Sequence, residues 1–342
     1  MQRKTLALII ASLASTPAFA DGWTDVFKLS GSAEANYIVT DNGTTTSSEL
    51  DRALLLNIDA SKEIAGGNKL GARISQKIAT GETVENKVGI GSREAYVSLS
   101  GDFGTVKAGR AFINSYLTLD WPFGQVGFWP VAEGGAGKVT SKVYLPNTLS
   151  YQSPALGNFS FSAQHGWGNE KHNKDSVYDL AGTLTLGKAT LYAGVLGGKP
   201  STKTKETKAN LTTGVVSETT TVTNDTENSQ QYLAASVGVS DNLTLRAMVQ
   251  SYKQEKAGKQ TNKGSETSLG LTYTMGKAGY IKAAYMDQNN TGTADDYSRY
   301  AVQYGRDIGG GAEWYARLTK VAPKASGAKD TNQFLTGVWI GF

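Results

Sequence analysis

The sequence predicts an all-β protein in which a single antiparallel sheet closes into a barrel that crosses a membrane. Three observations lead to this fold class. Apolar and polar residues alternate with period two, short and long connections alternate between the expected strands, and helical periodicity is hard to find after residue 20. Closure gives every backbone N–H and C=O a partner, which lipid requires because it offers no hydrogen bonds of its own.

The connections set the number of strands. Eight long, polar connections interleave with about seven short turns, which predicts about sixteen antiparallel strands with all the long loops at one end. The short turns include 100–104, 153–158, 186–188, 240–242, 276–279 and 306–311. The long connections are 40–49, 79–91, 112–142, 166–175, 199–229, 251–265, 287–296 and 320–331. Segment 199–229 is rich in Thr, Lys and Glu and is expected to be a mobile outer loop.

The alternation defines the strands themselves. Segment 27–39 reads FKLSGSAEANYIV, in which most odd positions are apolar and most even positions are polar. Similar segments of about ten residues recur to the end of the chain, the length that a tilted strand needs to cross a bilayer. A soluble β-sandwich would also alternate. Two sheets of that size would need a large apolar core, however, and hydrophobic residues make up only 39% of this chain.

Both ends of the chain fit export to a membrane. Residues 1–20 have a basic start, an apolar run too short to span a bilayer and an Ala-x-Ala site before Asp21. This pattern predicts a cleaved secretory signal peptide and a mature barrel of residues 21–342. The chain finishes on an alternating segment that ends in Phe342. If this last strand pairs with the first, the terminal ring lies in the aromatic girdle at the membrane interface.

Composition excludes several classes of function. The chain has 34 Lys and Arg against 30 Asp and Glu, and this near balance gives no sign of a nucleic-acid surface. Cys is absent, which excludes a catalytic thiol and a disulfide scaffold. Its two histidines, His165 and His172, fall at one expected loop, and we interpret them as solvated side chains rather than metal ligands. We therefore expect no enzyme, no metal site and no cofactor.

One stretch carries a more specific resemblance. Residues 92–112, SREAYVSLSGDFGTVKAGRAF, combine an Arg-x-Ala-aromatic strand, a Gly-Asp-Phe-Gly turn and a Gly-Arg pair that ends the next strand. Segments 56–63 and 147–165 and the terminal Phe342 add to the pattern. Together they resemble the general, non-specific porins of Gram-negative outer membranes. The resemblance implies a homotrimer of 16-stranded antiparallel transmembrane β-barrels, each with its third long loop folded inward to narrow a water-filled pore.

The resemblance also implies that acids on this inward loop face bases on the wall. The loop is 113–142, and its carboxylates are Asp120 and Glu133. Asp120 precedes a Trp-Pro-Phe-Gly segment in which the glutamate of the family pattern is missing. The loop also contains four aromatic residues that folding into the lumen would shelter, namely Trp121, Phe123, Phe128 and Trp129.

Three arginines are the first candidates for the basic wall. Arg93 matches the arginine that opens the fourth strand of the family, and Arg52 lies near the arginine of the second strand. Arg73 faces the lumen by its own alternation. Arg52 shares the parity of the apolar Leu54, which would face it to lipid unless a bulge intervenes.

Three further bases complete the expected wall. Lys138 and Lys142 lie close to Tyr144, where the family has an arginine, and they could replace its charge. Arg110 could line the wall or could equally be a trimer contact. Ser32 stands where members of the family often have a lysine.

The function that the resemblance implies is passive diffusion of ions and small hydrophilic solutes through the outer membrane of a Gram-negative bacterium. Because the candidate bases outnumber the two loop acids, we expect weak anion preference or near-neutrality. An alternative is a sugar-selective porin in which the four loop aromatics form a stacking surface. The expected partners are two further copies of the chain, outer-membrane lipid and lipopolysaccharide, and the barrel-assembly machinery, which would act on the C-terminal strand.

Overall fold

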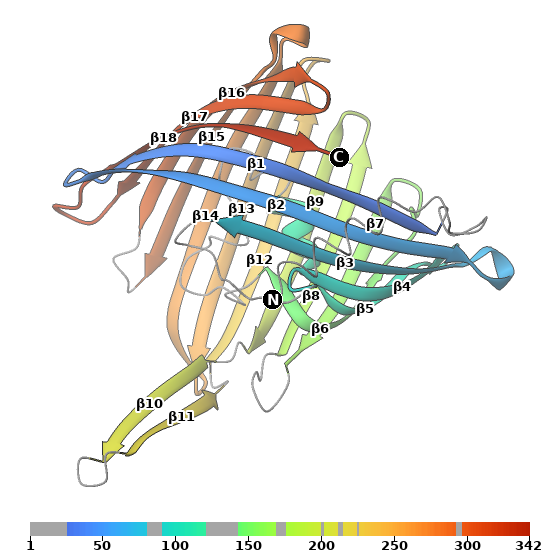
Figure 1. The fold of residues 1–342 in the computed structure, drawn as a ribbon, viewed down its shortest axis with the longest axis horizontal. Helices are drawn as coiled ribbons and strands as arrows, with labels where there is room; N and C mark the ends of the chain where they lie inside the picture. Colours follow the sequence, from blue (N-terminus) through green and yellow to red (C-terminus); the bar gives the residue numbers. More distant parts are fainter. Residues whose placement is uncertain are drawn as a thin grey trace.

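The computed structural model describes residues 26–80, 91–120, 143–168, 176–199, 202–210, 215–223, 226–291 and 296–342, with the backbone alone at 79–80, 120, 202–210 and 215–223. Sixteen strands form a closed antiparallel barrel, which confirms the predicted fold class (Figure 1). The strands follow one another around the barrel in chain order. No helix within the described ranges has the length and apolar character needed to cross a membrane.

The elements have the following bounds. The barrel strands are β1 (Phe27–Asp41), β2 (Thr46–Glu63), β3 (Lys69–Thr80), β4 (Glu94–Gly101), β5 (Gly104–Phe112), β6 (Tyr144–Gln152), β7 (Phe159–Trp167), β8 (Ser176–Leu186), β9 (Ala189–Lys199), β12 (Thr226–Gly238), β13 (Leu243–Lys256), β14 (Lys259–Thr274), β15 (Tyr280–Thr291), β16 (Tyr297–Gly309), β17 (Ala312–Pro323) and β18 (Thr331–Gly341). Strands β10 (Thr202–Asn210) and β11 (Val215–Thr223) form a separate hairpin that projects away from the barrel (Figure 1). Three short helical turns are η1 (Ala65–Gly67), η2 (Tyr116–Asp120) and η3 (Gly276–Ala278).

The barrel closes where the first strand meets the last. β1 and β18 pair from Ser32 and Gly341 to Asp41 and Asn332. Beyond this ladder, Gly31 N donates to Phe342 O at 2.8 Å and Phe342 N donates to Gly31 O at 3.0 Å. The predicted pairing of the last strand with the first is therefore confirmed, and Phe342 is held in the wall by its backbone.

The long-loop end differs from the prediction in three places. Residues 42–45 join β1 to β2, and only Ala257 and Gly258 separate β13 from β14, so the long loops predicted at 40–49 and 251–265 are wrong. Ala257 and Gly258 have φ values of 50° and 74°, the positive angles of a tight hairpin turn. Segment 199–229, predicted to be a mobile loop, contains the β10–β11 hairpin and the start of β12. Polar residues continue these ladders in water, because polarity by itself does not end a strand.

The apolar side chains of the wall face outward. On β4, Val97 and Leu99 are 56% and 37% exposed, whereas Glu94 on the opposite face is 7% exposed. Exposed apolar side chains lie on the outer face of the other strands as well, among them Leu29, Leu149, Leu180, Val195, Leu233, Val249, Leu269, Val302, Leu318 and Val338. This polarity is the reverse of a soluble β-sandwich and is that of a barrel with lipid outside and water inside.

The seam between β1 and β18 leads to a test of the closure. A Cβ atom on Gly31 would lie 2.2 Å from the Leu55 carbonyl oxygen and 2.8 Å from the Phe342 ring, whereas one on Gly270 would have its nearest neighbour at 3.7 Å. We expect Gly31→Ala to lower the free energy of unfolding by about 1–3 kcal/mol through overpacking. The matched Gly270→Ala should leave it unchanged or raise it by up to about 1 kcal/mol. Urea-induced unfolding in lipid vesicles measures both, and equal values for the two variants would contradict this account of the seam.

Candidate functional site

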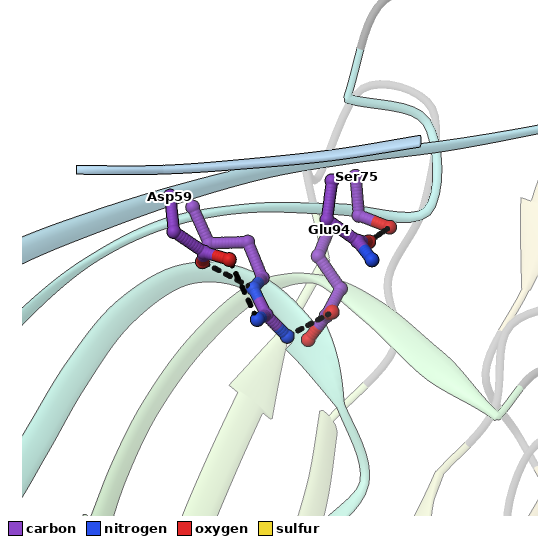
Figure 2. A network of polar contacts seen from close by, with 5 residues as sticks. Asp59, Ser75 and Glu94 are labelled. Carbon is purple, nitrogen blue, oxygen red and sulfur yellow. Dashed lines mark hydrogen bonds and ion pairs between the residues drawn. The ribbon is translucent and has the colours of Figure 1, made fainter. Parts of the chain in front are cut away.

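The inner wall of β2 to β5 carries the first charge cluster, defined as Asp59, Arg73, Glu94 and Lys107. The ladder places Asp59 directly opposite Arg73. Arg73 Nε lies 2.6 Å from Asp59 Oδ1 and Nη2 lies 2.9 Å from Oδ2, which is a bidentate pair. Arg73 Nη1 lies 3.6 Å from Glu94 Oε2. Figure 2 shows Asp59 and Glu94 on either side of the guanidinium, so Arg73 is fixed in orientation by two carboxylates.

The first charge cluster is electrically balanced. Lys107, on β5, places its Nζ 5.1 Å from the centroid of the Tyr96 ring. Together with Arg73 it supplies two positive charges against the two carboxylates of Asp59 and Glu94. The fields of two opposite charges a few ångströms apart largely cancel at longer range, and ions in the pore screen what remains. This wall therefore has a strong local field and little net charge.

The second charge cluster, defined as Arg246, Lys282, Glu313 and Arg317, lies across β13 to β17. Lys282 Nζ lies 4.4 Å from the centroid of the Tyr280 ring, and its ammonium experiences the charges of Glu313, Arg246 and Arg317. Arg246 Nη1 donates to Thr272 Oγ1 at 2.8 Å. The single carboxylate of the cluster, Glu313, accepts a hydrogen bond from the Tyr280 hydroxyl. Three bases against one acid give this part of the wall a positive field.

The start of the third long loop turns into the barrel. After β5 the chain enters η2, and Ile113, Ser115 and Leu119 are each 0% exposed. Ile113 and Leu119 belong to a buried apolar cluster with Val177, Leu196, Tyr232 and Met248, which lie on the inner face of β8, β9, β12 and β13. An apolar segment that contacts these strands can only lie inside the barrel. The inward course expected for the loop is thus present in its described part, residues 113–120.

A buried carboxylate holds this loop segment. Asp179 on β8 is 0% exposed, and it accepts hydrogen bonds from Ser115 N at 2.7 Å and from Ser115 Oγ at 2.6 Å. Ser115 Oγ also lies 2.9 Å from the Tyr232 hydroxyl on β12. Gln164 on β7 accepts from Asn114 N at 3.1 Å and donates to Phe112 O at 2.9 Å. These bonds satisfy polar groups of a chain segment that has left the sheet.

The sequence-derived bases do not all lie on the inner wall. Arg73 does, as described above. Arg52 pairs with Ala35, and the β1–β2 ladder runs without a register shift along its described length, so Arg52 lies on the outer face and its assignment to the wall is corrected. Arg110 is opposite Ala95, also on the outer side, and its Nε donates to Ser92 O at 2.5 Å.

Arg93 and Arg110 meet at the root of the loop instead. The Arg93 guanidinium lies 5.0 Å from the centroid of Phe112, and that of Arg110 lies 4.3 Å from the centroid of Tyr144. The Phe112 and Tyr144 rings are themselves 5.9 Å apart in an edge-to-face contact. Two arginines expected at a constriction thus pack against aromatic rings where the loop leaves the wall.

Several predicted site residues lie outside the described part of the chain. Asp120 ends η2, and its side chain is not among the described atoms. The remaining members of the predicted site that fall outside the described residues are Glu133, Lys138, Lys142, Trp121, Phe123, Phe128 and Trp129. Phe342 is described and is 57% exposed at the end of the seam.

Other functional residues were missed by sequence reasoning. Asp59, Glu94 and Asp179 all have inward parity on their strands, and Asp179 stands out between the outward Tyr178 and Leu180. Parity alone does not say which strands bring these carboxylates to the same level, because that depends on register. Within the described residues, no group of three or more His, Cys, Asp or Glu is placed to hold a metal ion.

A closed barrel with an apolar exterior, charged interior and inward loop is the architecture of an outer-membrane channel protein. The chain belongs to the Gram-negative porin family, whose model matches residues 5–325. Over 182 residues it is 28% identical to a chitoporin of Vibrio furnissii, and the match spans 48% of this chain and 48%, about half, of that curated relative.

Solved porin structures have the same fold. The anion-selective porin of Comamonas acidovorans superposes with a TM-score of 0.72 at 18% identity, covering 92% of this chain and 99% of that one. The trimer form of OmpT, an outer-membrane protein of Vibrio cholerae, gives 0.66 at 14% identity, covering 93% and 100%. The resemblance stated from the sequence is confirmed at the level of family and fold.

The contacts of Ser115 lead to a prediction about the loop. Ser115→Ala removes the hydroxyl bonds to Asp179 and Tyr232, and a hydrogen bond to a charged group contributes about 1.5–3 kcal/mol. We expect loop detachment to become about tenfold to a hundredfold more frequent, seen as added open-channel noise in single-channel recordings. Ser160→Ala, on the inner wall of β7, is the matched control. Recordings as quiet as those of the control would show that Ser115 does not hold the loop.

Proposed function

We propose that the chain forms a water-filled channel for passive diffusion of ions and small hydrophilic solutes across the outer membrane. The observation that carries this proposal is the reversed polarity of the wall, apolar outside and charged inside, around a closed sheet. Such a channel lowers the cost of crossing about 30 Å of hydrocarbon, because the solute keeps most of its water. The channel performs no catalysis and holds no cofactor in this proposal.

Within this function, the channel has a weak preference for anions. The first charge cluster is balanced, whereas the second has three bases against one acid, so the positive excess of the two clusters lies in the second. Fixed charge of one sign raises the concentration of ions of the other sign in the pore. The anion-selective porin of Comamonas acidovorans has the same fold.

Replacing one base of the second charge cluster tests the origin of the preference. A unit charge about 7 Å from the path of an ion changes its energy by about 0.6 kcal/mol in a water-filled pore. Salt in the pore about halves this energy, and the charge acts with opposite sign on chloride and potassium. We therefore expect Lys282→Gln to lower the chloride-to-potassium permeability ratio by about twofold to threefold. The ratio is obtained from the zero-current potential across a KCl gradient.

The control for this experiment is Lys188→Gln. Lys188 lies at the turn between β8 and β9, away from the inner wall, and pairs with Asp241 at 3.2 Å on the surface. It should leave the permeability ratio unchanged. Clear cation selectivity of the unmodified channel would contradict the proposed preference.

A second candidate function is sugar-selective transport. The observation in its favour is the local match to the chitoporin of Vibrio furnissii. We expect chitohexaose to cause at most brief interruptions in the ohmic current of a general channel, because no series of subsites then holds the sugar along the pore. Long-lived, saturable block of the current by chitohexaose would favour the sugar-selective function instead.

We further propose the assembly and the export route. Residues 1–20 act as a cleaved signal peptide, and residues 21–342 insert as a multi-pass barrel whose C-terminal strand is handled by the assembly machinery. Three copies associate, as in the trimer form of OmpT. Closure of a reconstituted channel in three equal current steps is the expected result, and closure in a single step would contradict the trimer.

A further inference from the structure

An exposed indole lies inside the barrel at the end with the short turns. Trp339 on β18 is in register with Glu34 on β1 and with Glu313 on β17, and it shares the inner face with the buried Asn36 and Tyr315. Its side chain is nevertheless 40% exposed. Of the tryptophans described, 167, 314 and 339, it alone has inward parity.

The indole is positioned by a glycine. A Cβ atom on Gly341 would lie 2.7 Å from Cη2 of Trp339 and 3.4 Å from Cζ2 and Cζ3, so the Cη2 end of the six-membered ring lies against Gly341. The end of β18 thus limits the movement of an indole that is 40% exposed. A membrane-girdle role does not account for this ring, because girdle aromatics face lipid.

Carboxylates lie at both edges of the indole. Side chains directly opposite on neighbouring antiparallel strands have Cβ atoms about 4.5–5.5 Å apart, so Glu34 and Glu313 border Trp339 from the two sides. Further donors are close on the same wall. Gln303 Nε2 donates to the Tyr280 hydroxyl at 2.9 Å, and this hydroxyl in turn donates to Glu313.

We propose that Trp339, Glu34 and Glu313 form a subsite for a neutral pyranose oligosaccharide at this mouth of the channel. A sugar ring stacks its apolar C–H face on the exposed part of the indole, which is the contact that an aromatic ring offers best. The hydroxyl groups of the same ring donate to the two carboxylates at its edges. This inference rests on the proposed channel function, and it uses none of the aromatic residues of the inward loop.

The surrounding charges favour a neutral ligand over an organic cation. Glu34 Oε1 is paired with Lys77 Nζ at 3.2 Å, and Glu313 accepts a hydrogen bond from the Tyr280 hydroxyl. Lys282 and Arg317 add positive charge near Glu313. A cation at Trp339 would meet carboxylates whose charge is already compensated, whereas hydroxyl groups can use the lone pairs that remain on each carboxylate.

Sugar block of single channels tests the subsite. Maltohexaose and chitohexaose are added in separate experiments, to one side of a planar bilayer at a time, and the residence time of each current block is measured. We expect brief blocks that are more frequent from the side of the short turns. Trp339→Ala should shorten the residence time about tenfold, whereas Trp339→Phe keeps a ring and should retain part of it.

Trp314→Ala is the matched control, because Trp314 lies on the outer face of the adjacent strand β17, where its ring is 6.0 Å from that of Tyr304. It should leave the residence time unchanged. If Trp339→Ala does not insert, Glu34→Gln is measured in its place, and a shorter residence time is expected because a carboxylate acceptor is lost.

Two results would overturn the subsite and leave the channel function intact. One is an ohmic channel that neither sugar blocks at any concentration up to saturation. The other is a residence time of the block that does not differ between Trp339→Ala and the unmodified channel. Where Glu34→Gln replaces Trp339→Ala, the same comparison applies to Glu34→Gln. Absence of any conductance would instead overturn the channel function, and the subsite with it.

Discussion

The closed backbone ladder is the constraint on which the rest of this structure depends. Lipid offers no partner to an exposed N–H or C=O, and each unsatisfied group there costs several kcal/mol, so a membrane-spanning sheet can have no free edge. Pairing of β1 with β18, extended by the two hydrogen bonds between Gly31 and Phe342, removes that edge. The seam is crowded enough to require a glycine at position 31, where a Cβ would meet the Leu55 carbonyl.

Closure also decides what each face of the wall can contain. Because successive side chains point to opposite faces, an apolar exterior leaves every second position free for polar and charged residues around the lumen. In the first charge cluster the inner positions pair across strands, because Arg73 is held by a carboxylate from each neighbouring strand. In the second charge cluster the ammonium of Lys282 experiences two further bases and one acid. The two clusters therefore differ in net charge although both belong to one sheet.

The inward loop segment depends on a different balance. A segment inside the barrel loses the hydrogen bonds of the ladder and must find others. Ser115 and Asn114 obtain them from Asp179 and Gln164, and the apolar cluster around Leu119 removes hydrocarbon from water. Burying the Asp179 carboxylate is costly unless it is hydrogen-bonded, and both of its oxygens accept from Ser115. The same contacts that place the loop thus satisfy the most deeply buried charge near it.

The sequence by itself determined the fold class, the number of strands, the pairing of first with last and the inward parity of Arg73, because alternation is a local pattern with a fixed period of two. It misplaced the hairpin ends at 40–49 and 251–265, since polar residues in water can extend a strand as well as end it. Only the tertiary structure decided that no bulge turns Arg52 inward, that Arg110 lies outside, and that Asp59, Arg73 and Glu94 meet. It alone placed Ser115 on Asp179, 64 positions away in the chain, and Trp339 between two glutamates. These relations depend on register and closure, which join residues far apart in the chain and leave no periodic signal within any one strand.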